Sequence, residues 1–370
     1  MVSQFFGAKD REELSGTIGT CITLTGISSL IIMILAPIVA RPLLELLNTP
    51  ASIIDWCDSY LTILFLGVAG SSYYNILSGI LRGLGDSVSA LIYLLVATIL
   101  NIILDLVFVA GLDLGVSGVA LATIIAQAVS AILCFLKLRK MTNLFDLNFH
   151  YLKPTKRHSM MVVRLGLPSG LTQVIFSMAM VLVQSLTNSF GEMFIAANVI
   201  IMRVDGFAMM PNFSFGNAMT TYSGQNVGAR EYDRVDKGAK QGTAVAVLVS
   251  TTLTILILIF GRFLMGIFTE TAALVELSYS MMKIVAVGYI AVAVTQSLSG
   301  VMRGAGDTMT PMWISLITTV AVRVPVAYIL NFVFHNSSCV FISLLVSWLT
   351  GALLTVLFYS KGTWKKKAIR

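Results

Sequence analysis

The sequence predicts an all-α membrane protein built from two related helical bundles, and three observations support this. The 370-residue chain is 56% apolar and only 12% charged, whereas about a quarter of the residues in soluble domains are charged. Apolar runs of roughly 20 residues, long enough to span a bilayer as helices, recur along it. A ten-residue motif occurs twice, 221 residues apart, which indicates duplicated architecture.

The apolar runs define about ten expected transmembrane helices. Their approximate ranges are 17–40, 56–81, 87–112, 116–136, 165–190, 193–222, 241–265, 277–301, 309–333 and 338–360. A tight polar turn at residues 335–338, His-Asn-Ser-Ser, is needed to separate the last two. The longest polar connection suggests a division into a first bundle at 1–140, a cytoplasmic linker at 141–160 and a second bundle at 161–370.

The repeat relates the two bundles. Residues 78–87 and 299–308 share six of ten identities, and the same offset aligns residues 4–10 with 225–231 and Arg41 with Arg262. Aligned halves in one orientation are typical of the parallel repeats of transporters. The offset leaves four helices in the first bundle and six in the second. A complete version would have twelve, so we expect two helices to be missing at the start.

Basic residues orient these helices. Of the 25 Lys and Arg residues, 20 fall in loops or tails on one side of the predicted stack, and the opposite loops hold only Arg41 and Arg262. Cytoplasmic loops of membrane proteins are enriched in Lys and Arg. The pattern therefore predicts a multi-pass protein of the cell (inner) membrane with both termini in the cytoplasm, and the loop placement of the charges argues against nucleic acid as a partner.

Catalytic and metal-binding functions find little support in the sequence. The four cysteines are scattered and only three histidines accompany them, so no disulfide framework or metal-ligand spacing is present. No Lys-Ser/Thr pair follows the repeated glycines as a phosphate-binding loop requires. We expect neither an enzyme nor a bound cofactor or metal.

Several motifs, in order, resemble the multidrug and toxic compound extrusion (MATE) family of cation-coupled antiporters. They are the sequences at residues 2–8 (VSQFFGA), 81–86 (LRGLGD), 101–105 (NIILD), 224–229 (GQNVGA), 302–307 (MRGAGD) and 323–325 (RVP). The resemblance implies two six-helix bundles facing a central cavity that opens alternately to either side. It implies secondary active efflux of cationic or amphipathic compounds in exchange for sodium ions or protons.

Two alternatives remain open at this stage. One is a flippase of related fold for lipid-linked sugars, which would need a cavity rich in Arg and Lys. The other is a non-transporting truncated remnant. The expected partners are small-molecule substrates and the lipid bilayer; we expect a monomer, with a partner chain as the alternative if two helices are missing.

Asp105 is the strongest candidate for cation coupling. An ionisable residue within a membrane-spanning run is costly and indicates function, and Asn101 lies one helical turn earlier, on the same face. The resemblance implies a cation site of Asn, Asp and Thr, matched here by Asn101, Asp105 and Thr123. The family site also uses an Asp on the first helix, which this chain lacks. The alternative is that Asp105 only caps the end of its helix.

Candidates for the substrate cavity come from the second half. They are the polar and charged residues Gln173, Gln184, Arg203 and Asp205, together with Met180, because flexible thioethers suit promiscuous binding surfaces. For Arg203 and Asp205 the alternative is a structural ion pair with another helix, since positions two apart point to different sides of a helix. For Met180 the alternative is ordinary packing.

The repeated loop motifs are expected to be structural. Their glycines suit tight cytoplasmic turns, with Arg and Asp linking each turn to a neighbouring helix. The residues are Arg82, Gly83, Gly85 and Asp86 in the first half, and Arg303, Gly304, Gly306 and Asp307 in the second.

Overall fold

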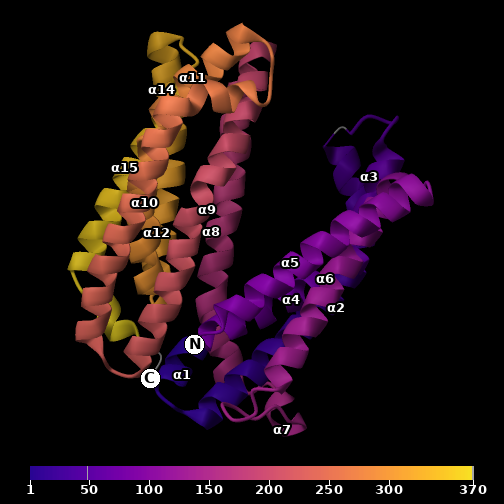
Figure 1. Ribbon diagram of the computed structural model, residues 1–370, viewed down its shortest axis with the longest axis vertical. Helices are drawn as coiled ribbons and strands as arrows, with labels where there is room; N and C mark the ends of the chain where they lie inside the picture. Colours follow the sequence, from indigo (N-terminus) through magenta and orange to yellow (C-terminus); the bar gives the residue numbers. More distant parts are fainter. Residues whose placement is uncertain (48, 369–370) are drawn as a thin grey trace. The chain divides into compact units, whose positions relative to one another are not determined.

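The computed structural model describes residues 1–47 and 49–368 (Figure 1). Every regular element in these ranges is a helix, and no strand occurs in them. The predicted all-α fold is therefore confirmed. The chain forms two compact units: an amino-terminal unit of residues 2–162 and a carboxy-terminal unit of residues 163–370, to which Met1 also belongs.

The amino-terminal unit is a bundle organised around α6. Its elements are α1 (Val2–Gly7), α2 (Arg11–Leu46), α3 (Ile54–Leu66), α4 (Val68–Gly83), α5 (Ser87–Asp105), the π-helical η1 (Leu106–Gly111), α6 (Gly115–Arg139) and α7 (Phe149–Leu152). Helix α6 packs against α3, α4, α5 and η1, while α2 packs against α3 and α4. Helix α8 (Lys156–Asn188) begins in this unit and continues into the other.

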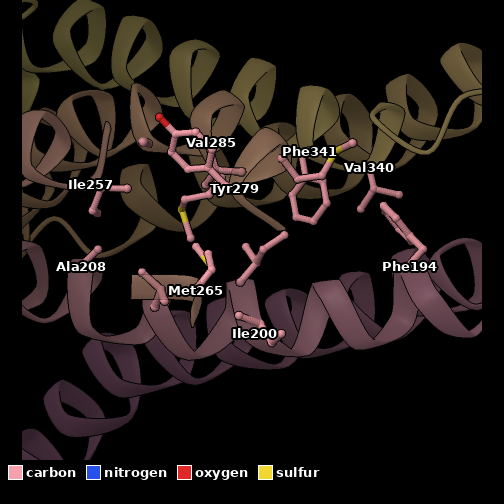
Figure 2. Close-up of a cluster of buried hydrophobic side chains, with 14 of the residues drawn as sticks. Phe194, Ile200, Ala208, Ile257, Met265, Tyr279, Val285, Val340 and Phe341 are labelled. Atoms are coloured by element: carbon pink, nitrogen blue, oxygen red, sulfur yellow. The ribbon is translucent and has the colours of Figure 1, made fainter. Parts of the chain in front are cut away.

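The carboxy-terminal unit is organised around α12. Besides α8 it contains α9 (Glu192–Gly228), α10 (Tyr232–Gly266), α11 (Ala272–Ala286), α12 (Gly288–Gly304), α13 (Met309–Leu316), the π-helical η2 (Ile317–Arg323), α14 (Val324–Phe334), α15 (Cys339–Ser360) and the short η3 (Thr363–Lys367). Helix α12 packs against α9, α10 and α15. Figure 2 shows part of the resulting core, where apolar side chains of α9, α10, α11 and α15 converge.

Eight of the described helices are long and apolar enough to cross a membrane, and two bent pairs bring the total to ten if each pair is one span. The pairs are α3 with α4, bent by 47°, and α11 with α12, bent by 42°. The expected turn at residues 335–338 is also present, because His335 adopts a left-handed conformation with φ of 50° between α14 and α15. The chain is thus a multi-pass membrane protein with helices close to the expected ranges.

The sequence repeat is matched in the structure by an equivalent ion pair in each of the two units. In the amino-terminal unit Arg41 Nη1 lies 3.1 Å from Asp55 Oδ1. In the carboxy-terminal unit Arg262 Nε lies 2.8 Å from Glu276 Oε2. Asp55 and Glu276 are themselves 221 positions apart, so the duplicated halves keep the same ion pair at the same place.

Residues 141–160, expected as a linker, pack onto α2. Arg11 at the start of α2 donates hydrogen bonds to both carboxylate oxygens of Asp146, at 2.9 and 2.8 Å, and these hold the pKa of Asp146 below its ordinary value. Further along, Thr23 donates a 2.6 Å hydrogen bond to the carbonyl of Leu152. Gly19 lies against the carbonyl of Tyr151, where a Cβ would collide with the backbone.

Candidate functional sites

Asp105 and Asn101 lie one helical turn apart near the end of α5, and both are partly buried. Asp105 is the last residue of α5, and the π-helical η1 follows it directly. Asp105 Oδ1 and Asn101 Nδ2 are both buried and have no hydrogen-bond partner in the part of the chain that the structure describes. A π-helical turn is rare and occurs frequently at functional sites. An unpartnered buried carboxylate oxygen is costly, and a proton or a cation there would remove that cost.

Thr123 belongs to α6, the helix that packs against α5 and η1. Its hydroxyl donates a 3.0 Å hydrogen bond to the carbonyl of Val119 on its own helix. This hydrogen bond uses the hydroxyl proton of Thr123, whereas the lone pairs of its oxygen stay available. The hydroxyl is therefore better suited to binding a cation than to donating to Asp105. None of the three residues hydrogen-bonds to another. The three predicted residues thus lie on two helices that pack against each other, α5 and α6.

A cavity of about 580 Å³ lies inside the carboxy-terminal unit. Its wall is formed by residues of α8, α9, α11, α12, α13, η2 and α15. Val285, Val340 and Phe341, which Figure 2 shows in the apolar core, also line it. A volume of this size is within the range of small-molecule sites.

Four of the five expected cavity residues line this space, namely Gln173, Met180, Gln184 and Asp205. Arg203 does not belong to the described lining, and its side chain is exposed. Positions two apart on a helix differ by about 200° around its axis, which explains why α9 presents only one of Arg203 and Asp205 to the cavity. The two residues form no ion pair with each other.

Among its described lining residues the cavity has one carboxylate and two guanidinium groups. Asp205 on α9 accepts a 2.9 Å hydrogen bond from the hydroxyl of Tyr289 on α12. Arg303 lies near the end of α12, and Arg323 is the last residue of η2; both line the cavity. Neither arginine donates a side-chain hydrogen bond to a residue that the structure describes.

The repeated glycine motifs form the turns α4–α5 and α12–α13. Gly85 and Gly306 have φ of 94° and 98°, a left-handed conformation that favours glycine. After each turn an aspartate caps the next helix: the backbone N–H of Ser89 donates to Asp86 at 3.0 Å, and that of Thr310 donates to Asp307 at 3.2 Å.

Asp86 also links its turn to a neighbouring helix, because Lys137 Nζ on α6 lies 3.2 Å from its carboxylate. Burial raises the pKa of Asp86, but hydrogen bonds from Ser89 and Lys137 outweigh this effect and hold the pKa below its ordinary value. Arg82 makes no ion pair with a described residue. Arg303, the equivalent of Arg82 in the second half, also forms no ion pair with a described residue, and it lines the cavity.

Gly83 and Gly304 serve close helix packing. Gly83, the last residue of α4, lies against Val2 of α1, where a Cβ would come within 3.0 Å of the Val2 side chain. Gly304 and Gly300 lie against the backbone of α9 at Thr220 and Gly216. Small residues four apart let two membrane helices approach closely, so these glycines position α12, and with it Tyr289 and Arg303.

The sequence did not predict that Arg303 lines the cavity or that Tyr289 holds the cavity residue Asp205 by a hydrogen bond. Tyr289 lies in an apolar run, where aromatic residues are ordinary, and Arg303 was assigned to the turn motif. The spacing of polar residues in α12 could have predicted its cavity-facing side. Gln296, Ser299 and Arg303 are three or four positions apart, and all three line the cavity. Spacing of this kind defines one helix face.

The chain matches the MatE family model over residues 1–107 and 168–329. It is 28% identical to the probable multidrug resistance protein YoeA of Bacillus subtilis, covering all of this chain and 81% of that protein. It is 26% identical to the probable multidrug resistance protein NorM of Thermotoga maritima, covering all of this chain and 80% of that protein.

Solved structures show the same fold. A multidrug resistance MATE family transporter of the MOP superfamily in its outward-facing conformation is 22% identical, with a TM-score of 0.93 over 99% of this chain and 82% of that one. A MATE structure in the bent conformation is 21% identical, with a TM-score of 0.92 over the same shares of the two chains.

Proposed function

The chain belongs to the MatE family, and from this premise we propose that it is a secondary active multidrug efflux transporter. Its relatives are described as multidrug resistance proteins, which supports multidrug efflux transport over catalysis. In this proposal the protein exports cationic or amphipathic compounds in exchange for sodium ions or protons. The small-molecule cargo enters the cavity of the carboxy-terminal unit.

The unpartnered carboxylate oxygen of Asp105 carries the coupling part of the proposal. A buried carboxylate oxygen without a hydrogen-bond donor is stabilised by a bound proton or cation. Asn101 on the preceding turn and Thr123 on the packed helix α6 supply further oxygens, which are the ligands that sodium prefers. The fit of these residues to a coupling ion rests on this set of oxygens and on the buried, unpartnered Oδ1 of Asp105.

Alternating access follows from coupling if the two conformations differ in their affinity for the ion. A ligand shifts a conformational equilibrium only by its differential affinity for the two states. Proton or sodium binding at Asp105 would compensate its charge in the conformation that binds the ion. The π-helical η1, which follows Asp105 directly, is an element whose hydrogen bonding can change register. The bundles 1–140 and 161–370, joined by the cytoplasmic segment 141–160, are the bodies proposed to move.

The proposed location is the cell (inner) membrane, with both termini in the cytoplasm. The distribution of Lys and Arg supports this orientation. The proposed monomer has the lipid bilayer as its surroundings and needs no nucleic acid or further cofactor.

A lipid-linked sugar flippase is a second candidate, because Arg303 and Arg323 both line the cavity. Guanidinium groups are well suited to pyrophosphate. The cavity also contains Asp205, whose negative charge opposes a multiply charged anion. For this reason multidrug efflux is the primary proposal.

The proposed function is tested by ethidium efflux from proteoliposomes of the full chain under an imposed sodium or proton gradient. Asp105→Asn should reduce gradient-driven efflux about tenfold or more, within the usual range of coupling energies. The matched control is Asp113→Asn, which makes the same change at an exposed position in the loop after η1. Wild-type efflux that depends on neither gradient, or efflux that is unchanged in Asp105→Asn, would refute ion coupling at Asp105.

A further inference from the structure

Arg323 is a buried cation that forms no hydrogen bond or ion pair through its side chain with a described residue. Its exposed fraction is 8%, its Nε is buried with no hydrogen-bond partner, and its side chain makes no ion pair in the part of the chain that the structure describes. A guanidinium group stays protonated in proteins. A buried charge normally has a partner, because its desolvation is costly. Arg323 lines the cavity, so a ligand is the partner that can reach it.

Asp205 attracts Arg323 electrostatically but forms no direct ion pair with it. The hydrogen bond from Tyr289 holds Asp205 on the side of α9 and α12, whereas Arg323 is fixed at the end of η2, which packs on α15. The cavity wall therefore has a negative group, Asp205, and a positive group, Arg323, that are not directly bonded to each other.

Arg303 lies at a different depth. Tyr289 and Arg303 are 14 positions apart (303 − 289) on the continuous helix α12, which corresponds to about 21 Å at 1.5 Å per residue. Arg303 thus stays well away from the Tyr289–Asp205 contact. The local site around Asp205 and Arg323 has one charge of each sign.

We propose that Arg323 binds a carboxylate of the cargo while Asp205 binds its cationic group, so that the cavity selects zwitterionic amphiphiles over cations of the same shape. This inference rests on the proposed function, since it treats the cavity as the cargo site. The planar guanidinium fork matches a carboxylate in bidentate geometry. The nearby Asp205 disfavours phosphate and pyrophosphate groups, which carry more negative charge.

A matched pair of dyes tests this selection. Tetramethylrhodamine carries a carboxylate and a delocalised cation, and its methyl ester carries only the cation. Binding to the purified full chain in lipid nanodiscs, followed by fluorescence anisotropy without any ion gradient, should be about tenfold tighter for the acid than for the ester. Equal affinities, or a preference for the ester, would overturn the inference without requiring any variant.

Variants assign the preference to Arg323. Arg323→Gln should bring the affinities for acid and ester to within about twofold of each other, and Arg323→Lys should retain part of the preference, because an ammonium keeps the charge but lacks the fork. Lys283→Gln is the control; Lys283 is exposed and lies 4.9 Å from the Tyr279 ring. Arg323→Gln binding that still prefers the acid would place the anion elsewhere and overturn the inference.

Competition separates the possible anions. Inorganic pyrophosphate should displace tetramethylrhodamine no better than acetate at equal concentration, and stronger displacement by pyrophosphate would overturn the zwitterion proposal in favour of the flippase candidate. The outcomes also separate the two levels of the argument. Selective binding without gradient-driven efflux would refute the transport proposal alone, and efflux of both dyes with equal affinity would refute the inference alone.

Discussion

The hydroxyl of Tyr289 donates a 2.9 Å hydrogen bond to the carboxylate of Asp205, joining α12 to α9 at the wall of the cavity. Tyr289 is fully buried, and Asp205 accepts no other side-chain hydrogen bond from a described residue. One phenol therefore fixes the position of the only carboxylate in the described cavity lining.

Tyr289→Phe should destabilise the protein and weaken binding of cationic dyes. Removing one partner from a buried hydrogen bond costs about 1–3 kcal/mol, and here the group left without a donor is a carboxylate. Thermal unfolding in detergent and dye binding measure the two effects. Tyr328→Phe is the control, because that hydroxyl makes a 3.2 Å hydrogen bond to Leu182 from a partly exposed side chain. Equal shifts in the two variants would contradict a special role for the Tyr289 contact.

Gly300→Ala should lower the thermal midpoint of unfolding. A Cβ at Gly300 would collide with the carbonyl of Gly216 on α9, and backbone cannot move aside as a flexible side chain can. Overpacking of this kind typically costs about 1–3 kcal/mol. Gly266→Ala in α10 is the matched control, because open space surrounds its added methyl group and alanine favours helix. A Gly300→Ala midpoint equal to that of the wild type would show that α9 and α12 are not tightly packed there.

The apolar runs predicted the helices because membrane spans require long apolar segments, and the 221-residue offset predicted the duplication. The breaks between α3 and α4 and between α11 and α12 were not predicted. The first break is at Gly67 and the second is at Val287, directly before Gly288, the equivalent of Gly67. An isolated glycine in an apolar run is equally compatible with a continuous helix. Contacts with neighbouring helices decide where the chain bends, and these are not local in sequence.

The site was harder to predict than the fold for the same reason. Helical spacing separates Arg203 from Asp205, but it does not tell which of the two faces a cavity. Arg303 lies in a motif that reads as a turn, and only the packing of Gly300 and Gly304 on α9 turns that face of α12 toward the cavity. The polar residues were thus recognisable as unusual, whereas their grouping depends on tertiary contacts.

Asp86→Asn should destabilise the α4–α5 turn at neutral pH. The carboxylate caps α5 and pairs with Lys137 at 3.2 Å, and losing a charged cap with its ion pair costs about 1 kcal/mol. Since the pKa of Asp86 is lowered in the folded protein, this stabilisation is complete above the unfolded value of about 4 and is lost as the pH falls through the folded value. Thermal unfolding at pH 7 and at pH 3 measures the change.

The expected difference between Asp86→Asn and the wild type is therefore large at pH 7 and shrinks at pH 3. Lys137→Met removes the ion pair but keeps the cap, so it should have a smaller effect that disappears at high salt. A difference between Asp86→Asn and the wild type that is the same at both pH values would show that the charge of Asp86 contributes nothing.

Native Cys57 offers a direct test of the proposed orientation. Cys57 lies in the first turns of α3, on the side of Arg41 and Asp55, and is the only described cysteine that is not buried. If the basic loops are cytoplasmic, this end of the helices faces outward. A membrane-impermeant maleimide added to intact cells should label the wild type and not Cys57→Ser. Lys140→Cys in the Cys57→Ser background, at an exposed basic loop, should be labelled only after permeabilisation. The reverse pattern would place the basic loops outside the cell and would contradict the proposed orientation.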